Sequence, residues 1–172
     1  MNVIFVEGLY VYSLIILFRR LFSLSYFVLL FLRVLIKRVE VVGWSMYPTF
    51  HNGDTLFLYR FGLLFHRINY ADIVLIEGIT YTNFPLIKRV VGIPGDVVEF
   101  NELIVKVNGS TILNGSNDPN TYKYSDLDKI VLSNYQYFVV GDAEFSDVTV
   151  LDSRGFGPVH KDRIRYKTVT RY

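Results

Sequence analysis

The chain has 172 residues, a formal net charge of +2 and no cysteine. The small net charge gives no indication of nucleic-acid binding, and the lack of cysteine excludes disulfides, thiol catalysis and cysteine metal sites. Hydrophobic residues make up 51% of the sequence, above the usual share for a soluble domain, and the surplus is concentrated at the N-terminus. The histidines His51, His66 and His160 are scattered without the spacing of metal ligands, so no metal site is expected.

The N-terminal segment contains two apolar stretches, residues 9–18 and 21–36, which are separated by Arg19 and Arg20. A helix needs roughly 20 apolar residues to cross the hydrocarbon core of a membrane. Residues 21–36 fall short of that length and include Arg33, whose side chain can reach the headgroups if it lies near one end of the helix. We therefore predict that 21–36 crosses the membrane and that 9–18 is an interfacial or second, shorter apolar stretch.

We predict that this segment stays attached as an anchor, because residues 40–42 read Glu-Val-Val and offer no small-residue cleavage site. Its orientation is ambiguous. The basic residues on its C-terminal side (Arg33, Lys37 and Arg38) outnumber those on its N-terminal side. This excess favours a cytoplasmic location for whatever follows the anchor. A membrane anchor that holds a cytoplasmic domain is therefore one alternative.

After residue 38 the chain consists of short runs rich in Val, Ile, Leu and Phe, bounded by Gly, Pro, Asn or Asp. Such runs are typical of β-strands separated by turns, and no long segment keeps a helical period. Residues 115–126 have the composition of a polar surface loop. We expect an N-terminal start and anchor over 1–38 and one mainly β, antiparallel domain over 39–172, with small sheets or a barrel-like sandwich. The predicted strands are 39–43, 55–60, 72–77, 85–92, 103–109, 135–142 and 163–172.

One small hydroxyl stands in an apolar and aromatic stretch soon after the anchor: Ser45, in GWSMYPTF (residues 43–50). A serine hydroxyl is a weak nucleophile until a base removes its proton. His51 and Asp54 lie close in sequence and suggest a Ser-His-Asp triad. The stretch HNGD that contains them is nevertheless more typical of a turn between two strands.

Lys88 is a second candidate base. It lies on the predicted strand 85–92, where side chains alternate, so Lys88 and Arg89 point to opposite faces. If Lys88 faces an apolar interior, burial lowers its pKa and lets the neutral amine accept a proton. Arginine cannot do this because it stays charged. The strand pattern alone leaves the question open, since adjacent basic residues more commonly lie on an exposed edge strand.

Four sequence boxes follow one another along the chain. An apolar anchor ends in RVLIKRVEVV and is followed by VVGWSMYPTF, IKRVVGIPGDVVEF and YFVVGDAEFSDVTVLDSRGFGP. This combination spans residues 33–159 and resembles type I signal peptidases, the Ser-Lys membrane endopeptidases of secretion, in the style of the compact Gram-positive bacterial members. The resemblance implies a signal-peptidase-type β domain with an N-terminal transmembrane helix. It also implies a single-pass protein of the cell membrane whose catalytic domain is extracytoplasmic.

The resemblance also implies roles for individual residues. Ser45 matches the nucleophile, Lys88 the general base, and Met46 a position that shapes the turn around the serine. The Ser45 N–H would donate to the oxyanion. The second donor in some members is a serine hydroxyl at the position of Gly43, so here a backbone or water-assisted site is implied. The positions that brace the active site in the family are matched by Asp142, Asp152 and Arg154.

The last box departs from the usual family form. Ala-Glu follows the Gly-Asp pair, and the gap before Asp-Ser-Arg is longer than usual. Val150 stands two residues before Asp152, where the family has a serine that orients the lysine. Thr149 or Ser146 could supply that hydroxyl through a shifted loop. The departure is compatible with a specialised paralogue, such as the signal-peptidase-like proteins encoded with pilus components.

Two functions therefore remain open. The resemblance implies a membrane-bound serine endopeptidase that removes signal peptides from secreted preproteins and needs no metal or nucleotide cofactor. Its partners would be preprotein cleavage regions and membrane lipid, not nucleic acid. The alternative is an assembly factor or chaperone for a pilin or another secreted protein, with little or no peptidase activity. The presence of both Ser45 and Lys88 favours the enzyme, and the altered last box favours the alternative.

Overall fold

The computed structural model describes residues 16–20, 22–29, 36–60, 67–79, 84–101, 103–114, 127–143 and 151–168. The chain divides into two compact units, Met1–Lys37 and Arg38–Tyr172.

The predicted membrane crossing is only partly covered by the described residues. Residues 16–20 and 22–29 are helical, whereas 30–35 lie outside the described part of the chain. Within the residues that the structure describes, no helix has the length and apolar character needed to span a membrane. Ile36, predicted as the last residue of the crossing, is instead the first residue of a strand.

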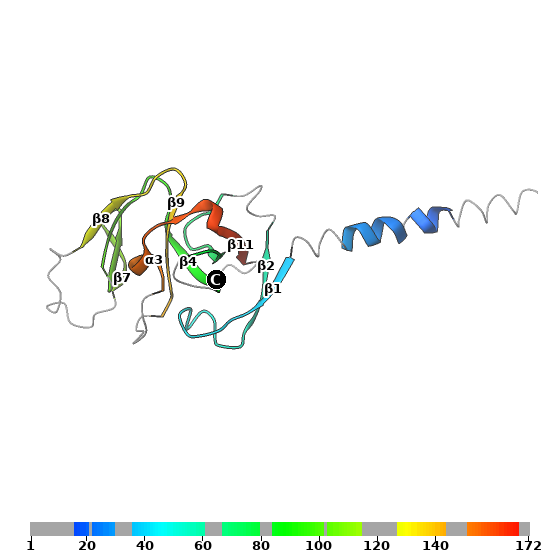
Figure 1. Cartoon of the computed structure of the whole chain (residues 1–172), viewed down its shortest axis with the longest axis horizontal. Helices are drawn as coiled ribbons and strands as arrows, with labels where there is room; N and C mark the ends of the chain where they lie inside the picture. Colours follow the sequence, from blue (N-terminus) through cyan, green and yellow to red (C-terminus); the bar gives the residue numbers. More distant parts are fainter. Residues whose placement is uncertain are drawn as a thin grey trace, which may run out of the picture. The chain divides into compact units, whose positions relative to one another are not determined.

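The described strands form two sheets (Figure 1). Each pairing between β2 and β11, β11 and β3, β3 and β4, β4 and β9, and β9 and β10 is antiparallel, as is each pairing in the smaller sheet. The prediction of a mainly β, antiparallel domain is therefore confirmed. The larger sheet has the order β1 (Ile36–Glu40), β2 (Thr55–Tyr59), β11 (Ile164–Thr168), β3 (Ile73–Ile76), β4 (Leu86–Gly92), β9 (Gln136–Val140) and β10 (Val159–His160). The smaller sheet has the order β7 (Ser110–Asn114), β6 (Ile104–Val107), β5 (Val97–Phe100) and β8 (Asp128–Val131).

The larger sheet is packed on both faces, because successive side chains of a strand point to opposite sides. Val74, Val90 and Val139 belong to the buried cluster on one face. Ile73 and Leu75, which alternate with them, belong to a second cluster on the other face. Both faces of β3 are therefore removed from water, whereas β4 has one buried face and, at Ile87 and Arg89, a half-buried one.

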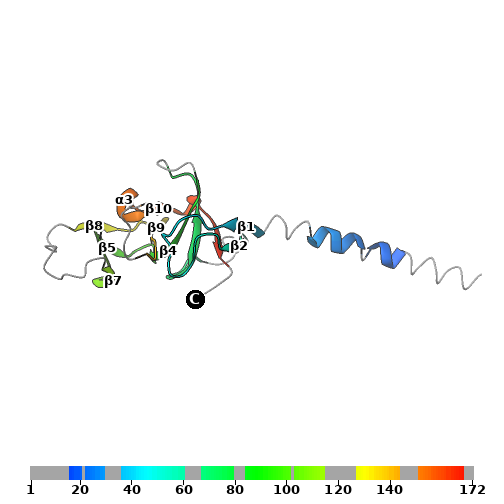
Figure 2. The ribbon, with the colours of Figure 1, turned by 90° about the horizontal axis from the view of Figure 1, so that it is seen from below.

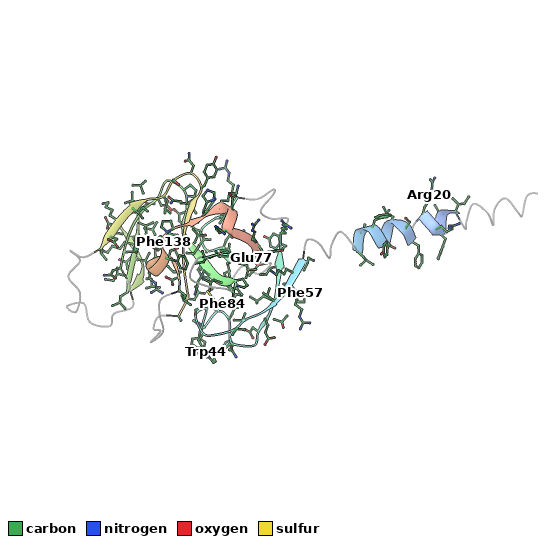
Figure 3. All side chains as sticks on the ribbon, in the orientation of Figure 1. Arg20, Trp44, Phe57, Glu77, Phe84 and Phe138 are labelled. Carbon is green, nitrogen blue, oxygen red and sulfur yellow. The ribbon has the colours of Figure 1, made fainter. Side chains whose placement is uncertain are left out.

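Phe138 on β9 connects the two sheets. This side chain, labelled in Figure 3, is fully buried. It belongs to one cluster with Val98 and Val105 of the smaller sheet and Val91 and Val140 of the larger one. Figure 2 shows β5, β7 and β8 grouped at the opposite end of the β domain from β2. β9 thus packs against the smaller sheet and continues, after Val140, into the residues of the predicted site.

The predicted strands agree with the observed ones where the apolar pattern is strong. The ranges 55–60, 72–77, 85–92, 103–109, 135–142 and 163–172 contain β2, β3, β4, β6, β9 and β11, and residues 169–172 lie outside the described part of the chain. The first predicted strand, 39–43, is wrong in position, because β1 ends at Glu40 and the chain then turns. The sequence pattern missed β5, β7, β8, β10 and the short helix α3 (Ser153–Phe156), and the predicted loop at 115–126 lies outside the described residues.

Candidate active site

Residues 43–50, which we call the Ser45 turn, lie between β1 and β2. Met46 is 1% exposed and is buried with Phe50 in the second core cluster. The Phe50 N–H donates to the Met46 carbonyl at 2.8 Å, which closes the turn on itself. Ser45 is exposed beside this buried methionine. Met46 thus attaches the turn to the core while the serine side chain remains accessible.

The stretch 51–54 is a turn between strands, as its composition indicates. The Gly53 N–H donates to the Val41 carbonyl at 2.8 Å, and the Val41 N–H donates to the Asp54 carbonyl at 2.8 Å. His51 and Asp54 are at the surface, where the His51 N–H donates to the Asp54 carboxylate at 2.7 Å. The Asp54 carboxylate therefore caps this turn. His51 and Asp54 thus have a structural role here that does not require a catalytic triad.

Lys88 is a buried lysine in the middle of β4. Its residue is 2% exposed, and its neighbours on the same face of the strand, Leu86 and Val90, are also buried. The register places it opposite Val74 of β3. The sequence left open whether Lys88 faces the interior or the surface, and in the structure it faces the interior.

Burial is the largest influence on the Lys88 amine and lowers its pKa to about 8. The carboxylate of Asp152 opposes this shift, because a nearby negative charge favours the ammonium form. The guanidinium of Arg154 lowers the pKa further, and the carboxylate of Asp142 raises it. The Lys88 amine thus loses its proton far more easily than an exposed lysine does.

Gly141 is the point at which the Ser45 turn and Lys88 meet. A Cβ atom placed on Gly141 would lie 2.5 Å from the Ser45 carbonyl oxygen and 3.4 Å from Lys88 Nζ. The Ala143 N–H donates to the same Ser45 carbonyl at 3.1 Å. The structure therefore brings the backbone of Ser45 and the amine of Lys88 to one place, just after β9. A side chain at position 141 would displace one of them.

Asp152 holds the backbone of Gly141 by a hydrogen bond. Its carboxylate accepts a hydrogen bond from the Gly141 N–H at 3.0 Å. It also binds Arg154, whose Nε and Nη2 donate to its two oxygens at 3.0 and 2.7 Å, and it caps α3 through the Arg154 N–H. Ser153, the first residue of α3, accepts the Val139 N–H at 3.0 Å. The predicted bracing residues Asp152 and Arg154 thus hold the end of β9 next to Lys88.

Asp142 has a different set of partners. Arg89 Nε and Nη2 donate to its two carboxylate oxygens at 2.7 and 2.6 Å. The Thr49 hydroxyl donates to Asp142 at 2.5 Å and accepts from Arg89 Nη2 at 3.1 Å. We call these three residues the Thr49–Arg89–Asp142 cluster. Sequence reasoning missed the participation of Thr49 and Arg89, although both lie within the boxes quoted for the resemblance.

Gly43 has a backbone that only glycine adopts easily, with φ of +95°. Its N–H donates to the side-chain oxygen of Asn52 at 2.8 Å. The Gly43 N–H is thus engaged by Asn52 in this structure, and the expected backbone or water-assisted oxyanion site at Gly43 stays a prediction. A serine at this position would be strained by the positive φ, so the serine hydroxyl found in some members does not suit this turn.

Some predicted residues cannot be located in the structure. Ser146, Thr149 and Val150, the candidates for orienting the lysine, lie outside the described residues. In the part of the chain that is described, no three His, Cys, Asp or Glu side chains are grouped so that they could hold a metal ion.

Comparison with known proteins finds a matching family model and similar chains. A family model described as signal peptidase, peptidase S26, matches residues 14–172. Signal peptidase I V of Bacillus subtilis is 32% identical over 137 residues, which cover 73% of this chain and 79% of that protein. Signal peptidase IB of Staphylococcus aureus is 28% identical over 165 residues, 85% of this chain and 83% of that protein. Among solved structures, a signal peptidase I from Enterococcus faecalis aligns with a TM-score of 0.42 at 22% identity, over 60% of this chain and 97% of that chain.

Proposed function

This chain belongs to the signal peptidase family, peptidase S26, and we propose that it is a membrane-bound serine endopeptidase that removes signal peptides from secreted preproteins. The observation that carries the proposal is the meeting of the Ser45 backbone and the Lys88 amine at Gly141. It is supported by the burial of Lys88, because a buried lysine can act as a base near neutral pH.

In the proposed reaction, neutral Lys88 accepts the proton of the Ser45 hydroxyl as the oxygen attacks the carbonyl carbon of the scissile bond. The oxyanion accepts a hydrogen bond from the Ser45 N–H, and a donor of this kind contributes about 2.7–4 kcal/mol in a comparable protease. Protonated Lys88 then gives its proton to the leaving amine, and the C–N bond breaks. A water then attacks the acyl carbon as Lys88 takes its proton, and Lys88 gives that proton to Ser45 Oγ as the acyl C–O bond breaks, which restores both Ser45 and the neutral amine.

The remaining site residues would act on this pair indirectly. Asp152 and Arg154 hold the Gly141 backbone, against which both Ser45 and Lys88 lie. The substrate would lie extended beside the sheet and form main-chain hydrogen bonds with it. Small side chains before the scissile bond would occupy shallow apolar pockets.

The proposal includes an anchor in the cell membrane, with the helical residues 22–29 as part of the single crossing. We predict that residues 1–20 are cytoplasmic and that the chain beyond about Arg38 is extracytoplasmic. A reporter active only outside the cytoplasm, fused after Tyr172, should be active, and a cytoplasm-specific reporter at the same place should be silent. The opposite pattern would place the C-terminal domain in the cytoplasm, as the distribution of basic residues favours, and would exclude a role in secretion.

The pH dependence of cleavage tests the proposed base directly. Because the pKa of Lys88 is lowered to about 8, the amine is mostly protonated below that pH and mostly neutral above it. We expect kcat/KM for a model preprotein to rise as pH increases through about 8 and then to level off. The measurement uses purified full-length protein, and its folding is monitored at each pH by circular dichroism. A rate that is flat across this range, or that falls as pH rises through it, would contradict a lysine base.

The assembly-factor function is the second candidate, and the altered box after Asp142 is the observation that favours it. The same assay separates the two. If the folded protein binds the preprotein without cleaving it at any pH, the binding function stands and the peptidase function fails.

A further inference from the structure

The Ser45 turn is attached to the residues after β9 at two points. The Ser45 carbonyl accepts the Ala143 N–H at 3.1 Å, and the Thr49 hydroxyl donates to the Asp142 carboxylate at 2.5 Å. Asp142 and Ala143 are consecutive and directly follow Gly141, which lies against Lys88. Burial of Met46 and Phe50 fixes the turn to the core. The two attachments, four residues apart along the turn, in addition fix it against the residues that follow β9.

The second attachment is also tied to the strand that carries the base. Arg89 follows Lys88 on β4 and donates to both Asp142 and the Thr49 hydroxyl, while its Nη1 donates to the Ala71 carbonyl at 3.1 Å. The Arg89 and Asp142 side chains are only 19% and 12% exposed, so water screens the pair weakly. The Thr49 hydroxyl is therefore held in a fixed position by Arg89, the residue that follows Lys88 on β4.

The chemistry of this position requires a hydroxyl. The Thr49 oxygen donates to a carboxylate and at the same time accepts from a guanidinium. A serine can do both, whereas valine, which has nearly the same shape as threonine, can do neither. Valine would also leave the facing carboxylate oxygen and one guanidinium N–H without this partner, which disfavours the present arrangement of the turn.

We propose that Thr49 is a positioning residue that sets the distance between the Ser45 hydroxyl and the Lys88 amine. This inference rests on the proposed Ser-Lys function and names a residue through which the site is held. Thr49 acts through the Ser45 turn and does not itself touch the reacting atoms. Catalysis is sensitive to such positioning, because a displacement of about 1 Å can lower a rate by on the order of 10²-fold.

The test compares Thr49→Val with Thr49→Ser in a preprotein cleavage assay. We expect Thr49→Val to lower kcat by about 10- to 100-fold with little change in KM, and Thr49→Ser to retain most of the activity. A displaced turn would also admit water to Lys88, so the midpoint of the pH profile should move to higher pH in Thr49→Val. A loss of stability alone would not produce that movement. Thr111→Val, at an exposed position of β7, is the matched control and should behave as wild type.

The outcomes distinguish this inference from the function on which it rests. If wild type cleaves and Ser45→Ala does not, the peptidase function stands; a Thr49→Val variant with wild-type kcat and an unmoved pH midpoint then overturns the positioning role alone. If wild type does not cleave, the function itself fails and the inference fails with it. Circular dichroism selects folded variants, and Thr49→Ala, which removes the same hydroxyl with less bulk, replaces Thr49→Val if the latter does not fold. An equal loss in Thr49→Ser and Thr49→Val would also contradict the proposal.

Discussion

Replacement of Ser45 by alanine is expected to abolish preprotein cleavage, with a fall in kcat on the order of 10⁴-fold or more, as expected for removal of a nucleophile. The substitution removes only an exposed hydroxyl. The contact that holds this residue in place, from the Ala143 N–H to the Ser45 carbonyl, belongs to the backbone and is retained. Folding should therefore be unchanged, and the loss should be confined to the chemical step.

The measurement is the conversion of a model preprotein to its mature form by purified full-length protein, followed by mass spectrometry to identify the cleaved bond. Thermal unfolding of Ser45→Ala should match that of wild type. Ser110→Ala removes another exposed serine hydroxyl, on β7 and outside the site, and should cleave normally. Wild-type cleavage by Ser45→Ala would show that another group is the nucleophile and would remove the basis of the proposed mechanism.

Replacement of Lys88 by methionine is expected to abolish cleavage and, at the same time, to increase the stability of the folded protein. Methionine keeps most of the length of the side chain but cannot accept a proton. Lys88 lies between buried residues of β4, so the apolar methionine suits its surroundings better than an amine does. A residue retained for catalysis at the expense of stability shows this signature, whereas a lysine that supports the fold would not.

The size and pH dependence of the stability effect follow from the lowered pKa. The pKa of Lys88 falls from 10.5 in the unfolded chain to about 8 in the folded protein. At 1.36 kcal/mol for each pH unit, burial of the ammonium costs about 3 kcal/mol below pH 8, where the lysine is charged in both states. As pH rises from about 8, the folded protein releases its proton first and wild type gains stability. The advantage of Lys88→Met should therefore be largest below pH 8 and should disappear above about pH 10.5.

Chemical denaturation at pH 7 and at higher pH measures this effect. Lys88→Arg should lose cleavage without gaining stability, because the guanidinium stays charged in the same buried position. Lys161→Met, at an exposed position, controls for the general effect of removing a positive charge. A Lys88→Met variant that still cleaves, or one that is markedly less stable than wild type at pH 7, would show that Lys88 is not a desolvated base.

The strands that could be predicted are those whose pattern is local. In β2, β3 and β4, β-branched and other apolar residues stand between turn residues, and turn chemistry acts within a few positions of the chain. β5 (VVEF) and β8 (DKIV) are four residues each and carry charges, so neither has a clear pattern alone. They become strands by pairing with each other, Val98 opposite Ile130, which is a contact between distant parts of the chain.

The sequence by itself identified the candidate nucleophile and base, because its boxes around Ser45 and Lys88 resemble those of type I signal peptidases. It also determined that Lys88 and Arg89 point to opposite faces, because alternation is a property of any strand. Which face is buried depends on the neighbours of β4 in the sheet, β3 and β9, and on what covers them. That information is absent from the strand itself.

Only the tertiary structure decided how the pair is held. The Ser45 backbone and the Lys88 amine meet at Gly141. The need for a glycine there arises only in the folded chain, because only there do these two groups occupy the space that a side chain would take. Thr49 belongs to the same cluster as Arg89 and Asp142, from three separate parts of the chain. Hydrogen bonds and close packing act over a few ångströms in space without regard to separation in sequence, so these contacts exist only in the folded chain.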